Sequence, residues 1–141
     1  MGNHVDLDRW PLVTAAQNGR LTVEEANRLN DGMREVLGRA QAENRRFAVV
    51  VDQRERQAPE KGALEIIHTF WSEREAEIAE WCVGYVSVVA TPSLADLVEN
   101  PGPGGLTVLG TVDYDAAVLW ADDRLAMFAE VRAVPESRPD S

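Results

Sequence analysis

The sequence contains very little cysteine and histidine, and each shortage excludes a kind of site. Cys82 is the only cysteine among the 141 residues, which excludes an internal disulfide and every cysteine-based zinc motif. A single thiol in such a chain is typical of a buried structural residue in a reducing cytosol. The histidines are His4 and His68, and no spacing of histidine with acidic residues forms a metal-ligand set. We therefore expect no metal and no cofactor.

Positive charge is also scarce. Lys61 is the only lysine, and 14 basic residues stand against 24 acidic ones, for a formal net charge of −10. Because phosphate contacts require a basic face, nucleic acid is excluded as a partner and an anionic membrane surface is disfavoured. No apolar run approaches the roughly 18 residues of a membrane span, and the first residues lack the pattern of a signal peptide. We expect a cytoplasmic protein with no membrane partner.

The remaining sequence alternates between strand and helix patterns. A hydrophobic content of 45% is enough for one core, so we predict a single domain over residues 10–131, after a flexible N-terminus (1–9) and before a disordered tail (132–141). Strands are predicted over 10–16, 47–52, 83–90 and 106–112, and helices over 22–40, 60–80, 92–98 and 114–131. This βαβαβαβα order predicts an α/β fold, with helices packed on a mainly parallel or mixed sheet of about four strands.

Several residues indicate where these elements begin and end. Thr22 and Glu25 form the pattern of a capping box, and Thr91 and Asp113 precede two further helices as N-caps. Pro11 favours an edge position for the first strand, because proline has no N–H to donate to a neighbour. The glycine-rich segment 100–105 indicates a connector, since no Gly-Lys-Ser/Thr follows it as a phosphate loop requires.

The strand over residues 47–52 supplies the first candidates for a site. An unbroken apolar run ends there at Asp52 and continues into a charged loop containing Arg54 and Arg56. Ligands of open α/β sheets bind outside the carboxyl ends of the strands, so these three residues are candidate ligand-binding residues. For Asp52 the alternative is a structural role, in which its carboxylate caps a neighbouring turn or helix.

The long helical segment supplies the other candidates. Arg74 falls on the same helical stripe as Trp71, so its guanidinium needs either an internal carboxylate or an anionic ligand. Trp71 packs in the core or lines an aromatic pocket. His68 is the only internal histidine and a weak candidate for a catalytic base, the alternative being a packed or surface residue. The acidic residues around position 75 indicate a solvated flank.

Several short motifs together resemble a known superfamily. They are residues 19–25, the strand 47–52, the strand residues 85–90 and the helical residues 114–121. This set resembles the STAS superfamily, and most closely its SpoIIAA-like branch. The resemblance implies a small mixed sheet with helices packed on it, used for regulatory protein contacts or for sensing nucleotide or lipid-like ligands. Anti-sigma-factor antagonists of the superfamily carry a phosphorylatable serine after a central strand, but residues 53–56 contain no hydroxyl.

The sequence leaves two functions open. The first is a non-enzymatic, STAS-like regulatory or binding module that engages a protein partner or a small ligand. The alternative is a small-molecule-binding protein, or a small enzyme, acting on an anionic or carboxylated substrate at the carboxyl end of the sheet. A pocket that brings His68 together with an arginine favours the alternative, and an exposed apolar patch favours a partner or a homodimer.

Overall fold

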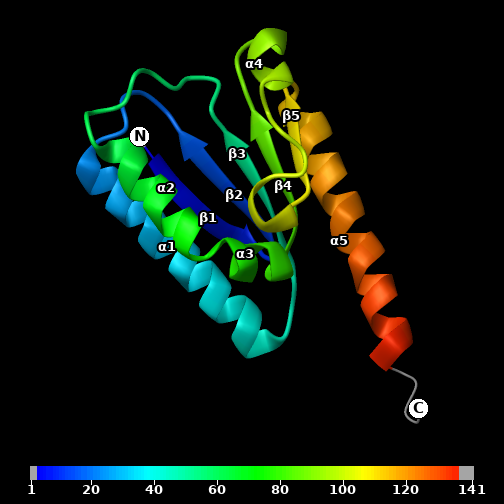
Figure 1. The fold of residues 1–141 in the computed structure, drawn as a ribbon. Coiled ribbons are helices and arrows are strands. Elements are labelled where there is room, and N and C mark those ends of the chain that lie inside the picture. Colours follow the sequence, from blue (N-terminus) through cyan, green and yellow to red (C-terminus); the bar gives the residue numbers. More distant parts are fainter. Residues whose placement is uncertain (1–2, 137–141) are drawn as a thin grey trace.

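One sheet organises the chain, and its strands lie in the order β1-β2-β3-β4-β5 (Figure 1). The computed structural model describes residues 3–136, with side chains over residues 4–128. The strands are β1 Asn3–Arg9, β2 Leu12–Gln17, β3 Phe47–Asp52, β4 Cys82–Val88 and β5 Val108–Thr111. The helices are α1 Val23–Glu43, α2 Ala63–Glu73, α3 Glu75–Trp81, α4 Pro92–Asp96 and α5 Tyr114–Glu136, with a 3₁₀ turn, η1, at Pro103–Gly105. The predicted α/β fold is confirmed.

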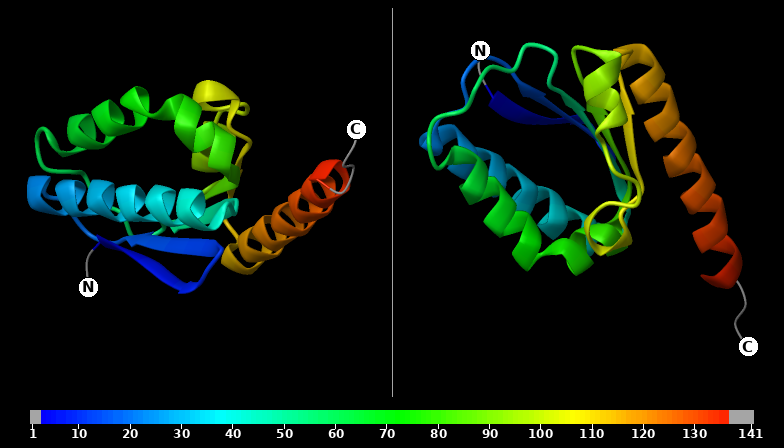
Figure 2. Two further views of the ribbon diagram at one scale, coloured as in Figure 1. Left: turned by 90° about the horizontal axis from the view of Figure 1, so that it is seen from below. Right: turned by 45° about the horizontal axis from the view of Figure 1, so that its top comes forward.

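The two faces of the sheet are covered by different helices (Figure 2). Strands β2 to β5 run parallel to one another, and β1 pairs antiparallel with β2. In β3, Phe47, Val49 and Val51 pack beneath α1, α2 and α3, whereas Ala48 and Val50 pack against α5. A strand that is buried on both faces needs apolar residues at successive positions, and residues 47–51 are all apolar.

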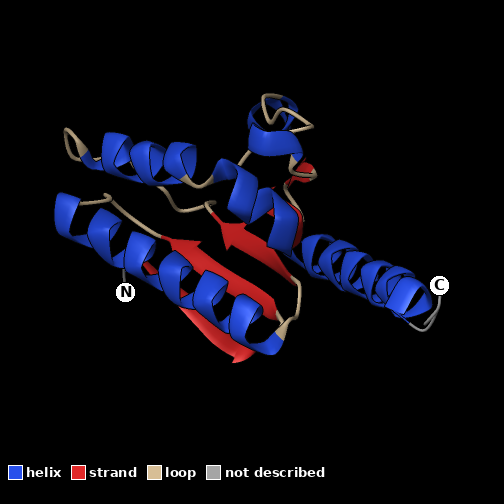
Figure 3. Ribbon diagram, turned by 60° about the horizontal axis from the view of Figure 1, so that its bottom comes forward, coloured by secondary structure: helices blue, strands red, loops and turns tan. Residues whose placement is uncertain are grey.

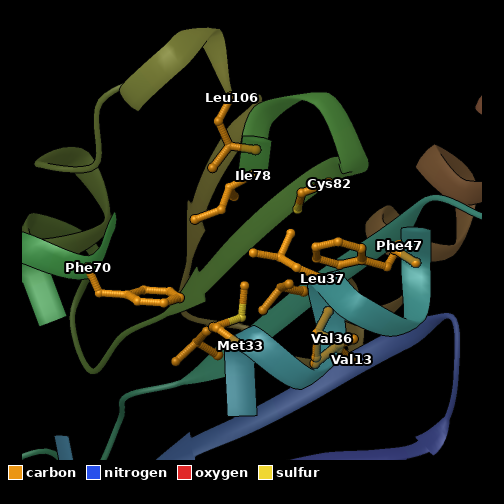
Figure 4. Packing of buried hydrophobic residues seen from close by; sticks show 12 residues of the cluster. Val13, Met33, Val36, Leu37, Phe47, Phe70, Ile78, Cys82 and Leu106 are labelled. Atoms are coloured by element: carbon orange, nitrogen blue, oxygen red, sulfur yellow. The ribbon is translucent and has the colours of Figure 1, made fainter. Parts of the chain in front are cut away.

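The larger core lies between the sheet and the first three helices. Figure 4 shows Met33, Val36 and Leu37 of α1 reaching toward the strands, where Leu37 lies beside Phe47. Cys82 belongs to this core, and burial raises the pKa of its thiol to about 12. The thiol is therefore protonated at neutral pH and has the structural environment that the sequence predicts for it.

Residues 3–9 correct the predicted flexible N-terminus, because they form strand β1 and bring the sheet to five strands. Val5 approaches α1 so closely that a Cβ on Gly32 would lie 2.9 Å from Val5 Cγ2. The prediction failed because Val5 and Leu7 are the only apolar residues of this strand, and so short an alternation does not indicate a strand by itself. Strand β2 is consequently not an edge strand. Pro11 lies just before it and joins the ladder through its carbonyl, which accepts from Ala48 N at 3.1 Å.

The long helix predicted over residues 60–80 is broken at Arg74 into α2 and α3. The Arg74 backbone leaves helical geometry (φ −123°, ψ 17°), and its N–H donates to Trp71 O at 3.2 Å. A new turn then begins with Ile78 N donating to Arg74 O at 2.9 Å, and it brings Ile78 into the core. Apolar spacing did not reveal the break, because both helices present apolar residues to the same core.

The three predicted N-caps are confirmed, whereas the helix predicted from residue 60 begins at Ala63. The Thr22 hydroxyl accepts from Glu25 N at 3.1 Å, and the Glu25 carboxylate accepts from Thr22 N at 3.2 Å. Thr91 and Asp113 accept through their side chains from Leu94 N and Ala116 N. Helix α5 continues to Glu136, so residues 132–136 of the predicted tail are helical, and residues 137–141 lie outside the described part of the chain.

Helix α5 packs on β4 at Gly84. A Cβ at this position would lie 2.8 Å from Trp120 Cζ3 and 3.2 Å from Arg124 Cγ. Arg124 holds the helix on this side of the sheet, since its Nε donates to Val83 O at 2.8 Å and its Nη2 donates to Thr107 Oγ1 at 3.3 Å. The absence of a side chain at Gly84 therefore sets how closely α5 approaches the sheet.

We expect Gly84→Ala to lower the free energy of unfolding by about 1–3 kcal/mol, because the added methyl group overpacks this contact. Gly38→Ala is the matched control: it lies in α1 with open space around its Cα, and alanine there should add up to about 1 kcal/mol. Urea unfolding of both variants measures the difference. Equal effects of the two substitutions would contradict a close approach at Gly84.

Candidate functional site

A cleft of about 770 Å³ opens between α2 and the part of the sheet formed by β4 and β5. Helix α2 packs on α1, side by side with it (Figure 3), and the cleft lies between α2 and these two strands. The cleft is lined by Gln17, Gln53, Arg56, Leu64, Ile67, His68, Trp71, Glu75, Tyr85, Leu97, Val98, Glu99, Pro101, Gly102, Pro103, Leu106 and Val108. Its ends differ in chemistry.

One end is polar and contains Arg56. Gln17 ends β2, while Gln53 and Arg56 follow the carboxyl end of β3. The backbone of this loop is fixed, because Gly19 N donates to Glu55 O and Gln57 N donates to Gly19 O, both at 2.9 Å. The guanidinium of Arg56 forms no side-chain hydrogen bond or ion pair among residues 4–128, whose side chains the structure describes. A charged donor group thus faces the cleft from a fixed backbone.

The middle of the cleft is aromatic and apolar. Trp71 of α2 and Tyr85 of β4 contact each other edge to face, with ring centroids 5.3 Å apart. Leu64, Ile67 and Val108 extend the apolar wall on either side of this pair. Burial raises the pKa of Tyr85 to about 12, so its phenol is protonated at neutral pH and can donate a hydrogen bond.

The far end is closed by the glycine-rich segment. Gly104 has a φ of +67°, and a Cβ there would lie 2.7 Å from Glu75 O, so only glycine lets the turn η1 approach α3 this closely. The segment is the connector that the sequence predicts, and it also forms a wall of the cleft through Gly102 and Pro103. Glu75 gives this end an acidic character opposite to that of the Arg56 end.

Asp52 and Arg54 lie outside the cleft and bind each other. Asp52 Oδ1 accepts from Arg54 N at 3.1 Å and from Arg54 Nε at 2.9 Å, and Asp52 Oδ2 accepts from Arg54 Nη2 at 2.9 Å. These hydrogen bonds hold the pKa of the Asp52 carboxyl below its usual value. Arg54 also lies over the ring of Tyr114, 5.6 Å from the centroid. The Asp52 carboxylate thus caps the turn that follows β3, as in the structural alternative for this residue.

Arg74 also lies outside the cleft. Its guanidinium lies 5.1 Å from the centroid of Phe70, and Nη1 contacts Glu77 Oε1 at 3.5 Å. Of the predicted site residues, the structure brings Arg56, His68 and Trp71 together in the cleft and separates Asp52, Arg54 and Arg74 from it. His68 is exposed on α2.

Sequence reasoning missed Tyr85 and Gln17 as members of the site. Tyr85 interrupts the small apolar residues of its strand with a phenol, and Gln17 is a polar residue at a strand end. Both signals become interpretable only when the strand order is known. Among the side chains that the structure describes, residues 4–128, no group of histidine, cysteine and acidic residues has the geometry to hold a metal ion. Over the same residues no helix is both long enough and apolar enough to span a bilayer.

The fold matches that of a solved structure. An uncharacterized protein of the DUF3478 family from Shewanella loihica PV-4, described as having a SpoIIAA-like fold, aligns with a TM-score of 0.58 over 85% of this chain and 92% of its own. The present chain has a SpoIIAA-like fold. The sequences are 12% identical, so this likeness concerns the SpoIIAA-like fold alone. No protein-family model matches the sequence, and neither does any curated protein.

We expect Arg54→Gln to return the pKa of Asp52 toward the ordinary aspartate value, because Arg54 is the main cause of its lowering. The lowered pKa means that the pair stabilises the fold at neutral pH, and that this contribution is lost as the pH falls below about 4. Since the Arg54 side chain is 43% exposed, we expect at most about 1 kcal/mol.

Carboxyl NMR titration of Asp52 in both proteins measures the shift, and urea unfolding at neutral and acidic pH measures the stability. Arg28→Gln is the control, since Arg28 pairs with Glu24 on α1. An Asp52 titration that is the same in wild type and Arg54→Gln would show that the ion pair does not form.

We expect Arg74→Ala to lower the free energy of unfolding by about 1 kcal/mol, because it removes the contact with Phe70 and the packing of the aliphatic stem. Arg74→Met should retain more stability, since it keeps that packing and removes the buried Nε, which has no partner. Thermal and urea unfolding measure both variants. A more stable alanine variant than methionine variant would contradict this packing role.

Proposed function

We propose that this chain is a non-enzymatic binding module that holds a small amphipathic ligand, with a single anionic group, in the cleft between α2 and the sheet. The observation that carries the proposal is the unpaired guanidinium of Arg56 at the polar end of an otherwise largely apolar cleft. The volume of about 770 Å³ falls within the range typical of small-molecule sites.

The anionic group of the ligand is assigned to Arg56. A guanidinium binds a carboxylate or phosphate through two parallel N–H donors, and the side-chain amides of Gln17 and Gln53 line the same end of the cleft. Arg54 is unsuited to this role because two of its donors already bind Asp52. Recognition of the anion therefore depends on one arginine of the loop and not on its neighbour.

The apolar part of the ligand is assigned to the middle of the cleft. From Leu64 to Trp71 the wall of α2 extends for about 10 Å at 1.5 Å per residue. Tyr85 and Val108 form the opposite wall. Because Glu75 lies at the far end, a second anionic group there would be repelled. This arrangement selects a monoanion with an apolar chain over a dianion of equal length.

The lining of the cleft supports binding more than catalysis. Over the described residues it contains no serine, threonine, cysteine or lysine that could act as a nucleophile. His68 forms no hydrogen bond with a carboxylate that would orient it as a base, again within the described residues. Its presence in the same cavity as Arg56 favours a small-molecule site over a flat partner-binding surface.

We expect decanoate to bind the wild-type protein and Arg56→Gln to weaken its binding about tenfold or more, because a hydrogen-bonded charge pair is lost. Arg54→Gln is the matched control: it removes the same charge from the same loop and should change the affinity little. Calorimetric titration gives the affinities, and quenching of tryptophan fluorescence that disappears in Trp71→Phe locates the ligand.

Two further ligands sharpen the test. Decanol lacks the charge, so we expect it to bind weakly and equally to wild type and Arg56→Gln. Decanedioate places a second carboxylate near Glu75 and should bind less tightly than decanoate. The proposal would be refuted by decanoate binding that is unaffected by Arg56→Gln.

A further inference from the structure

A second, smaller hollow lies beyond Arg56, at the carboxyl ends of β3 and β4. It has a volume of about 420 Å³ and is called the side hollow below. It is lined by Gln53, Arg54, Arg56, Gln57, Ala58, Pro59, Ser87, Val89, Ala90, Leu94, Leu97 and Val98. Its walls are the loop after β3 and the segment that contains α4. The turn η1 and the apolar residues of α2, which line the cleft, do not line the side hollow.

The side hollow and the cleft meet at Arg56. Gln53, Arg56, Leu97 and Val98 line both cavities, whereas Trp71 and Tyr85 line only the cleft. A group bound to the Arg56 guanidinium therefore has one cavity on each side of it. Leu97 lies along the same boundary and is 73% exposed, so its side chain is available to contact a bound group.

The side hollow offers hydrogen-bonding groups that the cleft lacks. Ser87 is only 9% exposed, and its side chain forms no hydrogen bond with the described side chains and backbone of residues 4–128. Arg54 binds Asp52 through Nε and Nη2, which leaves its Nη1 without a partner among the same residues. Together with the amide of Gln57 these groups can bind hydroxyl oxygens. Two arginines in the lining disfavour a cationic group there.

We propose that the ligand is a phosphodiester, with its apolar chain in the cleft and an uncharged, hydroxylated substituent in the side hollow. This inference rests on the proposed function, and it adds a second substituent on the anionic group of the ligand. A carboxylate has one substituent and can fill only one cavity. A phosphodiester has two, and its two free oxygens match the paired donors of Arg56. Its single negative charge also agrees with the repulsion expected at Glu75.

The test compares two dissolved probes, decyl phosphate and the glycerol diester of decyl phosphate, at about pH 5, where both carry mainly a single negative charge because the second pKa of the monoester is about 6. We expect the wild-type protein to bind the diester at least fivefold more tightly than the monoester. Ser87→Ala should weaken binding of the diester about fivefold through loss of one hydrogen bond, and should leave the monoester unchanged. Ala90→Leu fills the side hollow from an exposed position and should remove the preference for the diester.

Each outcome separates this inference from the proposed function. If decyl phosphate binds in an Arg56-dependent manner but the diester gains no affinity, the side hollow is not a substituent site and the inference is overturned. If neither probe binds although decanoate does, the inference is overturned and the proposed function stands; if decanoate also fails to bind, the proposed function fails. Sedimentation with phosphatidylglycerol vesicles distinguishes a bilayer source of the diester from a dissolved one. Binding to vesicles without binding of the dissolved diester would overturn the inference.

Discussion

The burial of β3 on both of its faces is the constraint on which the rest of the structure depends. Phe47, Val49 and Val51 lie under the first three helices, and Ala48 and Val50 lie under α5. Such a strand requires a helical layer on each side, and its carboxyl end must then emerge where those layers separate. The loop that carries Arg56 begins at this end. The position of the candidate site thus follows from the packing of the central strand.

Strong local patterns predicted most of the fold, and the exceptions have physical causes. Continuous apolar runs and N-caps such as Thr22 and Thr91 depend on neighbouring residues, so the sequence displays them directly. Strand β1 depends on a distant partner, because Val5 is held by the space above Gly32 on α1. The break at Arg74 depends on the depth at which Ile78 enters the core. Neither distance can be read from spacing along the chain.

The candidate site was predicted less completely than the fold. The predicted loop after β3 reaches the cleft only through part of its residues, because Arg54 and Arg56 look equivalent in the sequence although their side chains have different surroundings. Arg54 is occupied by Asp52 two residues away, while Arg56 is turned toward the cleft by a backbone contact with Gly19. Tyr85 joins the site only because β4 is the neighbour of β3. Which residues line the cleft therefore depends on side-chain pairing and on the order of the strands.

The attachment of α2 has a consequence for how such a protein can diversify. Helix α2 rests on α1, whereas the loop carrying Arg56 is tied to Gly19 and to the end of β4 through Gln53 N and Val88 O, 2.7 Å apart. In the proposed function α2 contacts the apolar chain of the ligand and the loop after β3 binds its anionic group, so these two contacts belong to separate structural units. Substitutions in α2 can alter the preferred length or shape of a ligand without disturbing the charged end. A lineage carrying this fold can acquire new ligands one half at a time.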